Sequence, residues 1–495
     1  MRRLFAVVAF VTLTVLPLPL QGQVPLEEYG ERRQALAEEV GEGVILLVGE
    51  AEPPQDYIRF FQNSPFQYLT GFRETNAMVV MASGSGGWEE RIFVNPRDPA
   101  TETWEGLRFG PERAEEVTGI PARSLEELQE ELNSHLADGE PLYVVGDVDP
   151  EADILTQDTQ RVLRLLDDRD VEIRNVTGIV DGLREIKSEA EQDLLRRSVE
   201  ITVLAHKDIM RKMEPGLGEF ELQALAEYTF RRYGADRPAF ASIVGSGPNS
   251  TILHYNENDS FVEDGEVVKI DIGASYQGYA GDITRTYPAN GTFSEAQREI
   301  YEIVLEAQKA AEEAAEPGAP RDLMFQEANR VLAMGLAELG LIEAPGATYD
   351  CETPAGALAE CPQLMMYYMH GLSHGIGLDV HDPWPATLEP GTAFTIEPGI
   401  YVRPNLLEIL PDTDRNQALV EAIEPTFERY KEIGVRIEDD YLMTEDGLEW
   451  LSADLPREVD ELEAAMAEPW GGPTPRISDV VEWYRDFQVP RWEHR

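Results

Sequence analysis

The stretch KIDIGASYQGYAGDITR, which runs from Lys269 to Arg285, contains two carboxylates, Asp271 and Asp282. Apolar and polar residues alternate around Asp271, which predicts a half-buried strand. Asp282 follows eleven residues later, so on one straight strand the two carboxylates would lie roughly 36 Å apart. The chain can fold back because small residues separate them. We therefore expect an antiparallel hairpin with both Asp side chains at its centre.

Two carboxylates held close together repel each other, and a cation or a shared proton must relieve that repulsion. Further along the chain, the run from His370 to His381 contains three histidines, and Glu397 and Glu438 stand in strand-like segments that would face a polar pocket. Two Asp, two Glu and one His carry four negative charges, which two divalent cations would balance while leaving room for a bridging water or hydroxide. A set of ligands that is rich in carboxylates favours Mn(II), with Co(II), Zn(II) and Fe(II) as alternatives.

Five motifs in this region resemble those of the pita-bread metallopeptidases, and among them the aminopeptidase P (Xaa-Pro aminopeptidase) family. The motifs are HYNEN from His254, IDIGASYQGYAGDITRT from Ile270, MHGLSHGIGLDVHD from Met369, TIEPGIY from Thr395 and RIEDD from Arg436. Their order and spacing agree with the family throughout.

The resemblance implies a role for each of these positions. The ligands of a dinuclear metal centre would be Asp271, Asp282, His374, Glu397 and Glu438. Glu397 would also act as general base, and His254 and His381 as catalytic hydrogen-bond donors, while His370 and Arg436 would contact the substrate or orient a carboxylate. The implied reaction is hydrolysis of the first peptide bond of peptides with proline in second position, through a hydroxide that bridges the two metals.

Each motif alone has a simpler interpretation. An isolated pair of aspartates can lie at turns or strand edges, and a single Glu before Pro-Gly can mark the end of a strand. His370 and His374 have the i, i+4 spacing of a helical zinc pair, but the glycines around them disfavour a helix, so we expect an irregular strand or loop. The conjunction of five motifs in family order favours the site.

Several related functions compete with this hypothesis. Prolidase, which cleaves only Xaa-Pro dipeptides, is the main alternative, and methionine aminopeptidase is a more distant one. Creatinase-like relatives work without the metals, and non-catalytic binding proteins on this fold usually lack some of the ligands. All five ligand positions carry ligating residues here, and the long amino-terminal region favours aminopeptidase P.

The composition limits the class of protein and its partners. The 495 residues, with 42% hydrophobic content, are enough for two domains with cores of their own. A formal net charge of -52 argues against nucleic acid or an anionic membrane surface as partner. The resemblance implies peptide substrates and a homo-oligomer, either a dimer or a tetramer.

The sequence predicts four segments. Residues 1–23 combine a charged start with an apolar run, as in a secretory signal peptide, and predict an exported (periplasmic or secreted) protein with no membrane anchor after signal removal. Residues 24–180 predict an α/β domain like the amino-terminal domain of creatinase and prolidase, and residues 181–468 an α+β pita-bread catalytic domain. Residues 469–495 form a Pro- and Trp-rich extension to which we assign no chemistry.

The amino-terminal region is less similar to the family than the catalytic region. At Pro65 the family more usually carries an Asp, which in some members reaches toward the active site of a neighbouring subunit, so that contact is in doubt here. For most aromatic residues between Phe60 and Phe72 we expect core packing.

Three further features have structural interpretations. Ser188 and Glu191 form a predicted capping box at the start of a long amphipathic helix, and His206 on its apolar stripe is expected in the core. The only cysteines, Cys351 and Cys361, flank a short insert. In an exported protein we expect a disulfide that closes a loop at the mouth of the site, with two free buried thiols as the alternative.

Overall fold

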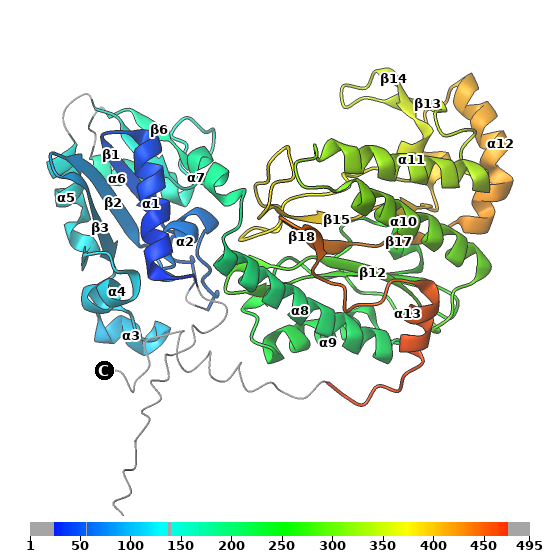
Figure 1. Cartoon of the computed structure of the whole chain (residues 1–495), viewed down its shortest axis with the longest axis horizontal. Coiled ribbons are helices and arrows are strands. Elements are labelled where there is room, and N and C mark those ends of the chain that lie inside the picture. Colours follow the sequence, from blue (N-terminus) through cyan, green and yellow to red (C-terminus); the bar gives the residue numbers. More distant parts are fainter. Residues whose placement is uncertain (1–23, 56, 137–139, 168, 170, 474–495) are drawn as a thin grey trace, which may run out of the picture.

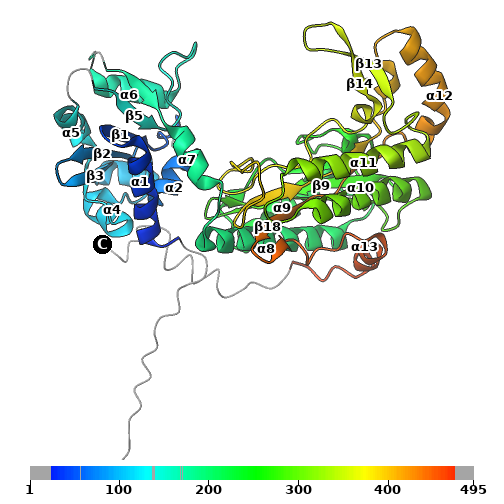
Figure 2. The ribbon, with the colours of Figure 1, turned by 45° about the horizontal axis from the view of Figure 1, so that its top comes forward.

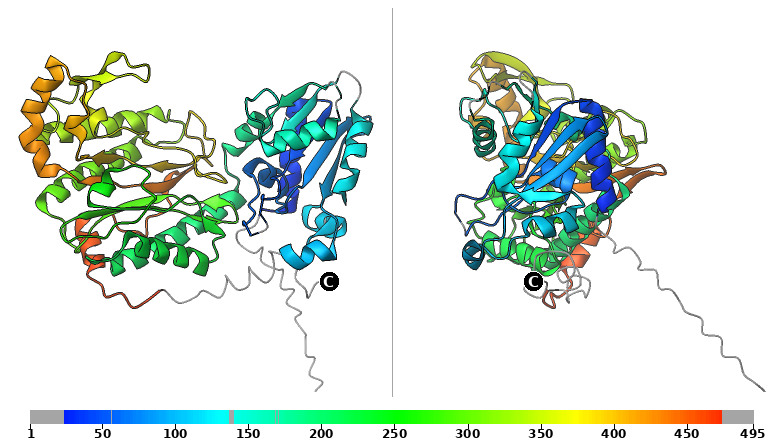
Figure 3. Two further views of the ribbon diagram at one scale, coloured as in Figure 1. Left: turned by 180° about the vertical axis from the view of Figure 1, so that it is seen from behind. Right: turned by 90° about the vertical axis from the view of Figure 1, so that its left-hand side faces the viewer.

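The computed structural model of the chain has two α/β parts that lie side by side (Figure 1). It describes residues 24–473 except 56, 137–139, 168 and 170, so the predicted signal peptide and most of the Pro- and Trp-rich extension lie outside the described residues. Figure 3 shows the same two parts from behind and from the side. Helix α7 (Thr177–Arg184) leads from the first part to the second and runs across the boundary predicted near residue 181.

The amino-terminal part is built on a six-stranded sheet in the order β4-β3-β2-β1-β5-β6. The sheet is mixed: β1 pairs antiparallel with β2 and parallel with β5. The central strand β1 is buried along its whole length because helices cover both faces. The strands are β1 (Val44–Val48), β2 (Met78–Gly84), β3 (Gly87–Val94), β4 (Ala122–Ser124), β5 (Leu142–Val145) and β6 (Ile173–Asn175).

Alternate residues of β1 enter two different cores. Ile45 and Leu47 belong to a cluster that includes Leu36, Phe66 and Val180, contributed by α1, α2 and α7. The other three residues of β1 belong to a second cluster, to which α5 and α6 contribute. The helices of this part, besides α7, are α1 (Leu26–Val40), α2 (Ser64–Thr70), α3 (Pro99–Glu105), α4 (Gly110–Thr118), α5 (Leu128–His135) and α6 (Gln157–Leu166).

In the carboxy-terminal part, α8 and α9 lie on one side of the strands and α10 and α11 on the other (Figures 1 and 2). One large core of buried apolar residues joins these layers. The helices are α8 (Glu189–Lys212), α9 (Glu219–Arg232), α10 (Glu295–Ala314), α11 (Asp322–Leu339), α12 (Asp414–Tyr430) and α13 (Val459–Met466). The strands are β7 (Arg237–Pro238), β8 (Ile243–Ser246), β9 (Val267–Ile272), β10 (Ala274–Tyr276), β11 (Tyr279–Ala280), β12 (Ile283–Pro288), β13 (Thr348–Glu352), β14 (Leu358–Pro362), β15 (Ala393–Ile396), β16 (Gly399–Tyr401), β17 (Gly434–Arg436), β18 (Asp439–Thr444) and β19 (Gly447–Trp450).

The predicted hairpin is present and has two stages. Strands β9 and β12 pair antiparallel with Asp271 opposite Thr284, and the shorter pair β10 and β11 forms its tip. Gln277 and Gly278 both have positive φ at this tip, as a two-residue turn of the I′ type requires. Asp271 lies in β9 opposite Thr284, and Asp282 comes two residues before Thr284, so the fold-back makes the two carboxylates diagonal neighbours in the hairpin.

The prediction that the strand around Asp271 is half-buried is wrong. All six residues of β9 are buried, including Lys269 at 0% and Asp271 at 5% exposure. The strand is central, between β8 and β12, and the face that carries its polar residues is covered by other polar side chains of the protein. The alternating residues of β9 therefore face an apolar core on one side and a buried polar region on the other.

Helix boundaries agree with the local signals of the sequence. The capping box of α8 is confirmed: Ser188 and Glu191 exchange hydrogen bonds of 3.0 and 3.3 Å. His206 is confirmed as a core histidine, with no exposed surface, and its ring nitrogens contact the Tyr287 hydroxyl and the Ile283 carbonyl at 2.9 Å. Burial lowers the pKa of His206 to about 3, so the ring is neutral.

Cys351 and Cys361 form a disulfide between β13 and β14, as predicted. The hairpin that they link projects from the layers of this part (Figure 2). Its hydrogen bonds join it to the start of α12, where Asn416 contacts both the N–H and the carbonyl of Asp350. The expected place of this hairpin at the mouth of the site stays a prediction.

No helix among the described residues is long and apolar enough to cross a membrane.

Candidate metal centre

Four carboxylates and one imidazole from four chain segments converge in the carboxy-terminal part. Asp271 and Asp282 come from the β9–β12 hairpin, and His374 from the irregular segment before β15. Glu397 stands between β15 and β16, and Glu438 between β17 and β18, so both occupy breaks between strands where strand residues were predicted. At these breaks the backbone pairs with other segments. The Glu438 N–H donates to Thr284 O at 3.0 Å, and the Glu397 N–H donates to Leu372 O at 2.8 Å.

His374 is the centre of the cluster. Its Nε2 lies 3.5 Å from Glu397 Oε1, 3.6 Å from Asp282 Oδ2 and 4.0 Å from Glu438 Oε1. One ligand atom from each of Asp282, His374 and Glu438 lies within 4.8 Å of the others, close enough to bind one ion. The segment from His370 to His374 is not helical, as expected from its glycines.

The second ring nitrogen of His374 fixes the orientation of the ring. Nδ1 lies 3.0 Å from Gly375 O, and a carbonyl can only accept, so Nδ1 carries the proton. Nε2 is therefore a lone-pair donor aimed at three carboxylates. A histidine that donates one N–H to a carbonyl while the other nitrogen faces a polar cavity has the usual arrangement of a metal ligand.

Burial and mutual repulsion disturb the acids strongly. Burial, followed by the charges of Glu438 and Asp271, raises the pKa of Asp282 well above its ordinary value. Burial and then Glu397 do the same to the pKa of Glu438. Burial raises the pKa of Glu397 to about 8, against the opposing effect of the Arg436 guanidinium. The protein alone thus supplies too little positive charge to keep these acids ionised.

Arg436 is the one guanidinium among the described residues that forms ion pairs with the carboxylates of this cluster. It is 4% exposed and forms an ion pair with Asp271 Oδ2, and its Nε donates to Thr284 Oγ1 at 3.0 Å. Thr284 Oγ1 in turn donates to Glu438 Oε2 at 2.6 Å. Arg436 was predicted to contact the substrate or orient a carboxylate, and its contacts are those of a group that orients Asp271.

These residues fit a pair of divalent cations. Asp271 Oδ1 is buried and has no hydrogen-bond partner among the described residues, which is costly for a carboxylate oxygen unless a cation binds it. The donor set of carboxylates and one imidazole suits first-row divalent metals. The repulsion that raises the pKa values is the repulsion that two cations would remove.

His370 lies beside the cluster without joining the group around His374 Nε2. Its Nε2 contacts the Tyr401 hydroxyl at 2.8 Å, and its Nδ1 contacts Gly371 O at 2.8 Å and lies 3.6 Å from Glu397 Oε2. Burial lowers the pKa of His370 to about 3, with Arg436 adding to the effect. A neutral imidazole is thus held next to Glu397.

His254 and His381 lie at the exposed edge of the cluster. The His381 ring is 4.1 Å from the His374 ring, centroid to centroid. His254 lies near enough to His370 for its charge to contribute to lowering the pKa of His370. Both imidazoles have exposed surface, as groups that meet a substrate require.

Sequence reasoning missed Tyr401, Thr284 and Asp440. The Tyr401 hydroxyl accepts from Arg436 Nη1 at 3.2 Å besides contacting His370, and Asp440 Oδ2 accepts from the Asp282 N–H at 2.8 Å. Thr284 and Tyr401 lie inside two of the quoted motifs, and Asp440 ends a third. These residues are marked by a polar side chain that is buried beside a ligand. Because burial is not visible in the sequence, the sequence analysis missed them.

Comparison with known proteins agrees with this geometry. Residues 193–445 match metallopeptidase family M24, and residues 29–143 match the N-terminal domain of aminopeptidase P. The Xaa-Pro aminopeptidase of Haemophilus influenzae is 37% identical over 460 residues, 91% of this chain and 99% of the relative. That of Escherichia coli is 35% identical over 465 residues, 90% of this chain and 98% of the relative.

The chain belongs to the Xaa-Pro aminopeptidases of metallopeptidase family M24.

Solved structures of the family superpose on most of the chain. A variant of Escherichia coli aminopeptidase P in complex with substrate matches with a TM-score of 0.75 and 34% identity, covering 90% of this chain and 98% of that one. A zinc-substituted form of the same enzyme in complex with product also gives a TM-score of 0.75. The two-part fold, with an aminopeptidase P amino-terminal domain and a pita-bread catalytic domain, is therefore confirmed, and divalent metal ions are supported for the family.

In this member of the family the amino-terminal domain contacts the loop between His374 and His381. Ser64 at the start of α2 donates to Asp379 Oδ1 at 2.6 Å, and Arg184 donates to Asp379 Oδ2 at 2.6 Å. Asp379 lies between His374 and His381. Also from α2, Gln67 Nε2 donates to Gln277 O at the tip of the β9–β12 hairpin at 2.8 Å. The two domains thus meet at the loop and the hairpin that carry predicted ligands.

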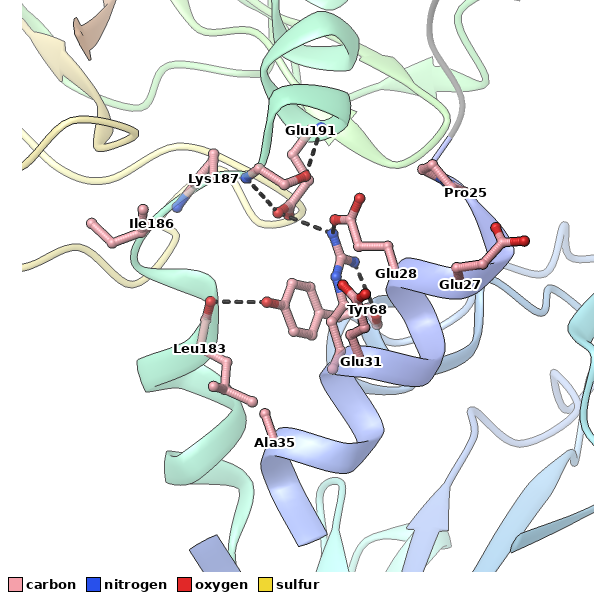
Figure 4. Close-up of a pocket in the computed structure, with 12 residues that line it drawn as sticks. Pro25, Glu27, Glu28, Glu31, Ala35, Tyr68, Leu183, Ile186, Lys187 and Glu191 are labelled. Carbon is pink, nitrogen blue, oxygen red and sulfur yellow. Dashed lines mark hydrogen bonds and ion pairs between the residues drawn. The ribbon is translucent and has the colours of Figure 1, made fainter. Parts of the chain in front are cut away.

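A surface pocket of about 580 Å³ lies at the same junction but is not the candidate site. It is lined by α1, by Tyr68 of α2 and by the connection between α7 and α8. The Tyr68 hydroxyl donates to Leu183 O of α7 at 2.8 Å (Figure 4). Arg32 in its wall lies 4.0 Å over the Tyr68 ring and is paired with Glu28 and Glu191. Lys187, the other cation that lines the pocket, is paired with Asp382, so both cations are already neutralised, in contrast to the acids around His374.

Proposed function

We propose that this protein removes the first residue of peptides that have proline in second position. The observation that carries the proposal is the set of three carboxylates around His374 Nε2, from Asp282, Glu397 and Glu438, which the protein itself leaves short of positive charge. Family membership over about nine-tenths of the chain supports the substrate class, since the relatives are Xaa-Pro aminopeptidases.

Two divalent cations would be held by Asp271, Asp282, His374, Glu397 and Glu438. When bound, they would balance the four carboxylate charges and make an ionised water available near neutral pH. We propose Mn(II) as the native metal, because oxygen donors dominate the set, with Co(II), Zn(II) and Fe(II) as alternatives.

The residues around the cluster divide the remaining work. Glu397, with Oε1 toward His374 and Oε2 toward His370, is placed to take a proton from the attacking water and pass it to the leaving proline nitrogen. His381 and His254, at the exposed edge, are placed to donate hydrogen bonds to the scissile carbonyl or the substrate amide. His370 is the proposed substrate contact, and Arg436 holds Asp271 in place through an ion pair.

The first experiment compares an Xaa-Pro-Yaa tripeptide with an Xaa-Pro dipeptide, using metal-free protein with and without added Mn(II). Metal-dependent release of the first residue from the tripeptide, lost in Glu397→Gln, is the expected result. Cleavage of the dipeptide alone would make the protein a prolidase. If neither peptide is cut with any divalent metal, the catalytic assignment fails and a binding role on the same fold becomes the better explanation.

The same experiment identifies the metal if Co(II), Zn(II) and Fe(II) are added in parallel at equal free concentrations. The highest kcat/KM with Mn(II) is expected. Higher activity with another ion at its matched occupancy would replace Mn(II) in the proposal.

We further propose that the protein is exported and acts as a dimer or tetramer. The charged and apolar start of the sequence supports export, and so does the disulfide between Cys351 and Cys361, because such bonds persist in oxidising compartments. Fractionation of cells that express the full chain, together with light scattering of the purified protein, tests both statements. A cytoplasmic or monomeric protein would contradict the corresponding one.

A further inference from the structure

Lys269 is a buried cation for which the proposed mechanism has no use. It is 0% exposed and lies in β9, two residues before Asp271, so the two side chains emerge on the same face of the strand. Its Nζ donates to Ile252 O at 2.5 Å and to Leu253 O at 3.3 Å. Among the described residues it forms no ion pair with a carboxylate. Its hydrogen bonds go to the backbone of the segment that leads to His254.

An ammonium group in this place is costly. Removing a charge from water without pairing it with an opposite charge is unfavourable. An apolar side chain in the centre of β9 would not incur that cost. The bonds that Lys269 makes are therefore the feature that requires explanation.

The segment that Lys269 holds is also anchored by hydrogen bonds at both of its ends. Upstream, Ser250 Oγ accepts from Gly434 N–H at 3.0 Å, and downstream the Tyr255 hydroxyl donates to Glu219 Oε2 at 2.9 Å. Between these two points Thr251 is buried and the Ile252 N–H donates to Asn249 O at 3.1 Å, but Ile252 is 48% exposed and His254 is exposed. The two carbonyl bonds from Lys269 tie this stretch to the strand that carries Asp271.

The same ammonium group lies against a second support of the site. Its Nζ is 5.3 Å from the centre of the Tyr401 ring, within the range of a cation–π contact. The Tyr401 hydroxyl contacts His370 Nε2 at 2.8 Å and Arg436 Nη1 at 3.2 Å. Lys269 thus connects the backbone before His254 with the tyrosine beside His370.

We propose that Lys269 is a positioning residue that sets the place of His254 relative to the carboxylate cluster, by holding the carbonyl oxygens of residues 252 and 253. The catalytic part of this inference rests on the proposed function, because His254 is a catalytic group only if the protein is a peptidase. The structural part does not, since it concerns the order of the segment itself.

The structural part is tested by hydrogen exchange of the purified full chain, followed by mass spectrometry. Lys269→Met keeps the length of the side chain and removes the donors, and we expect exchange in peptides covering 247–258 to become roughly 10-fold faster. Lys187→Met is the matched control. Lys187 is also buried, but its Nζ contacts Asp382 and the carbonyls of Arg184 and Pro383. Unchanged exchange in 247–258 is expected for the control, and unchanged exchange in Lys269→Met would overturn the proposal.

The catalytic part is tested by a double-mutant cycle on the Mn(II)-loaded enzyme with an Xaa-Pro-Yaa peptide. Lys269→Met alone is expected to lower kcat roughly 10- to 100-fold, with two metal ions still bound per chain. In a His254→Ala background the same change is expected to cost less than about 3-fold, because the group that it positions is already absent. Equal losses in both backgrounds, or loss of metal, would overturn the proposal.

Lys269→Gln provides a second test in case Lys269→Met does not fold. It keeps an N–H donor on β9 and is expected to fall between the unmutated chain and the Met variant in both measurements. A Gln variant with no advantage over Met in either would contradict hydrogen-bond donation as the anchoring interaction. If the unmutated chain cleaves no peptide, the proposed function fails, and the exchange experiment still decides the structural part.

Discussion

Glu438 and Asp439 are consecutive buried residues, and they show two opposite ways of burying an acid. Asp439 is fully neutralised by the protein: its carboxylate accepts from Arg285 Nη2 at 2.7 Å, from Gln308 Nε2 at 2.9 Å and from the Ser452 hydroxyl. Glu438 points to the other face, where three more acids share one guanidinium. The comparison teaches that burial alone does not identify a functional acid. The missing counter-charge does.

The largest expected difference between the two faces is in activity. Asp282→Asn removes one of the acids around His374, and we expect kcat/KM to fall by at least roughly 10³-fold, because a metal ion contributes several kcal/mol to hydrolysis. Steady-state kinetics and metal content by elemental analysis measure this change. Asp439→Asn is the control on the opposite face and should keep two bound metals. Retained activity in Asp282→Asn would remove the comparison altogether.

Asp439→Asn should in turn destabilise the fold more than Asp282→Asn does. The change leaves Arg285, which is 0% exposed, as a buried charge without its carboxylate, and breaking such a pair costs roughly 3–5 kcal/mol. Asp282→Asn removes a repelled charge, so the metal-free protein should become no less stable. Denaturant unfolding of both metal-free variants gives the two values. Equal losses of stability would show that Asp282 is also neutralised by the protein.

The pH dependence of stability sharpens the same contrast. The pKa of Glu397 is raised to about 8 in the folded metal-free protein, whereas an unfolded chain has an ordinary glutamate. Its protonated form therefore favours folding below about pH 4.5, and that stability is lost as pH rises through about 8. Bound metal keeps the carboxylates ionised. We expect the Tm difference between metal-loaded and metal-free protein to widen from pH 5 to pH 8.

A Tm difference that stays constant over this range would mean that the acids are already ionised in the metal-free protein. Asp439→Asn serves as a reference here. Because it leaves the face around His374 unchanged, it should lower both Tm curves while preserving the widening.

The smallest expected effect concerns Tyr401, which supports the site by hydrogen bonds. Tyr401→Phe removes the hydroxyl that contacts His370 and Arg436, and the loss of a hydrogen bond to a charged group is worth roughly 1.5–3 kcal/mol, so kcat/KM should fall roughly 10- to 100-fold. Tyr367→Phe is the matched control, since Tyr367 is equally buried and its hydroxyl donates to Leu341 O instead. Similar losses in both variants would indicate general destabilisation.

Much of the fold and of the site could be predicted from local patterns. Capping residues, apolar periodicity and turn residues are local, so α8 and the fold-back between Asp271 and Asp282 appear where the sequence places them. The candidate ligands were also predictable, because metal chemistry restricts them to a few residue types and the motifs resemble a known family. The structure brings all five into one cluster.

Burial and partnership could not be predicted in the same way. The sequence predicts a half-buried strand around Asp271, but the polar face of that strand is covered by side chains from other segments, at residues 284, 401 and 436. For the same reason the sequence left open whether Arg436 contacts the substrate or orients a carboxylate, and in the structure it forms an ion pair with Asp271.

The sequence by itself determined which elements form, where they begin and which residues have the chemistry of metal ligands, because those properties depend on near neighbours and on side-chain type. Only the tertiary structure decided which buried charges have partners. Glu438 and Asp439 look alike in the run RIEDD, yet the face that each side chain enters gives one an arginine and the other a set of repelling acids. Electrostatic energy depends on distance in space, and folding alone sets that distance.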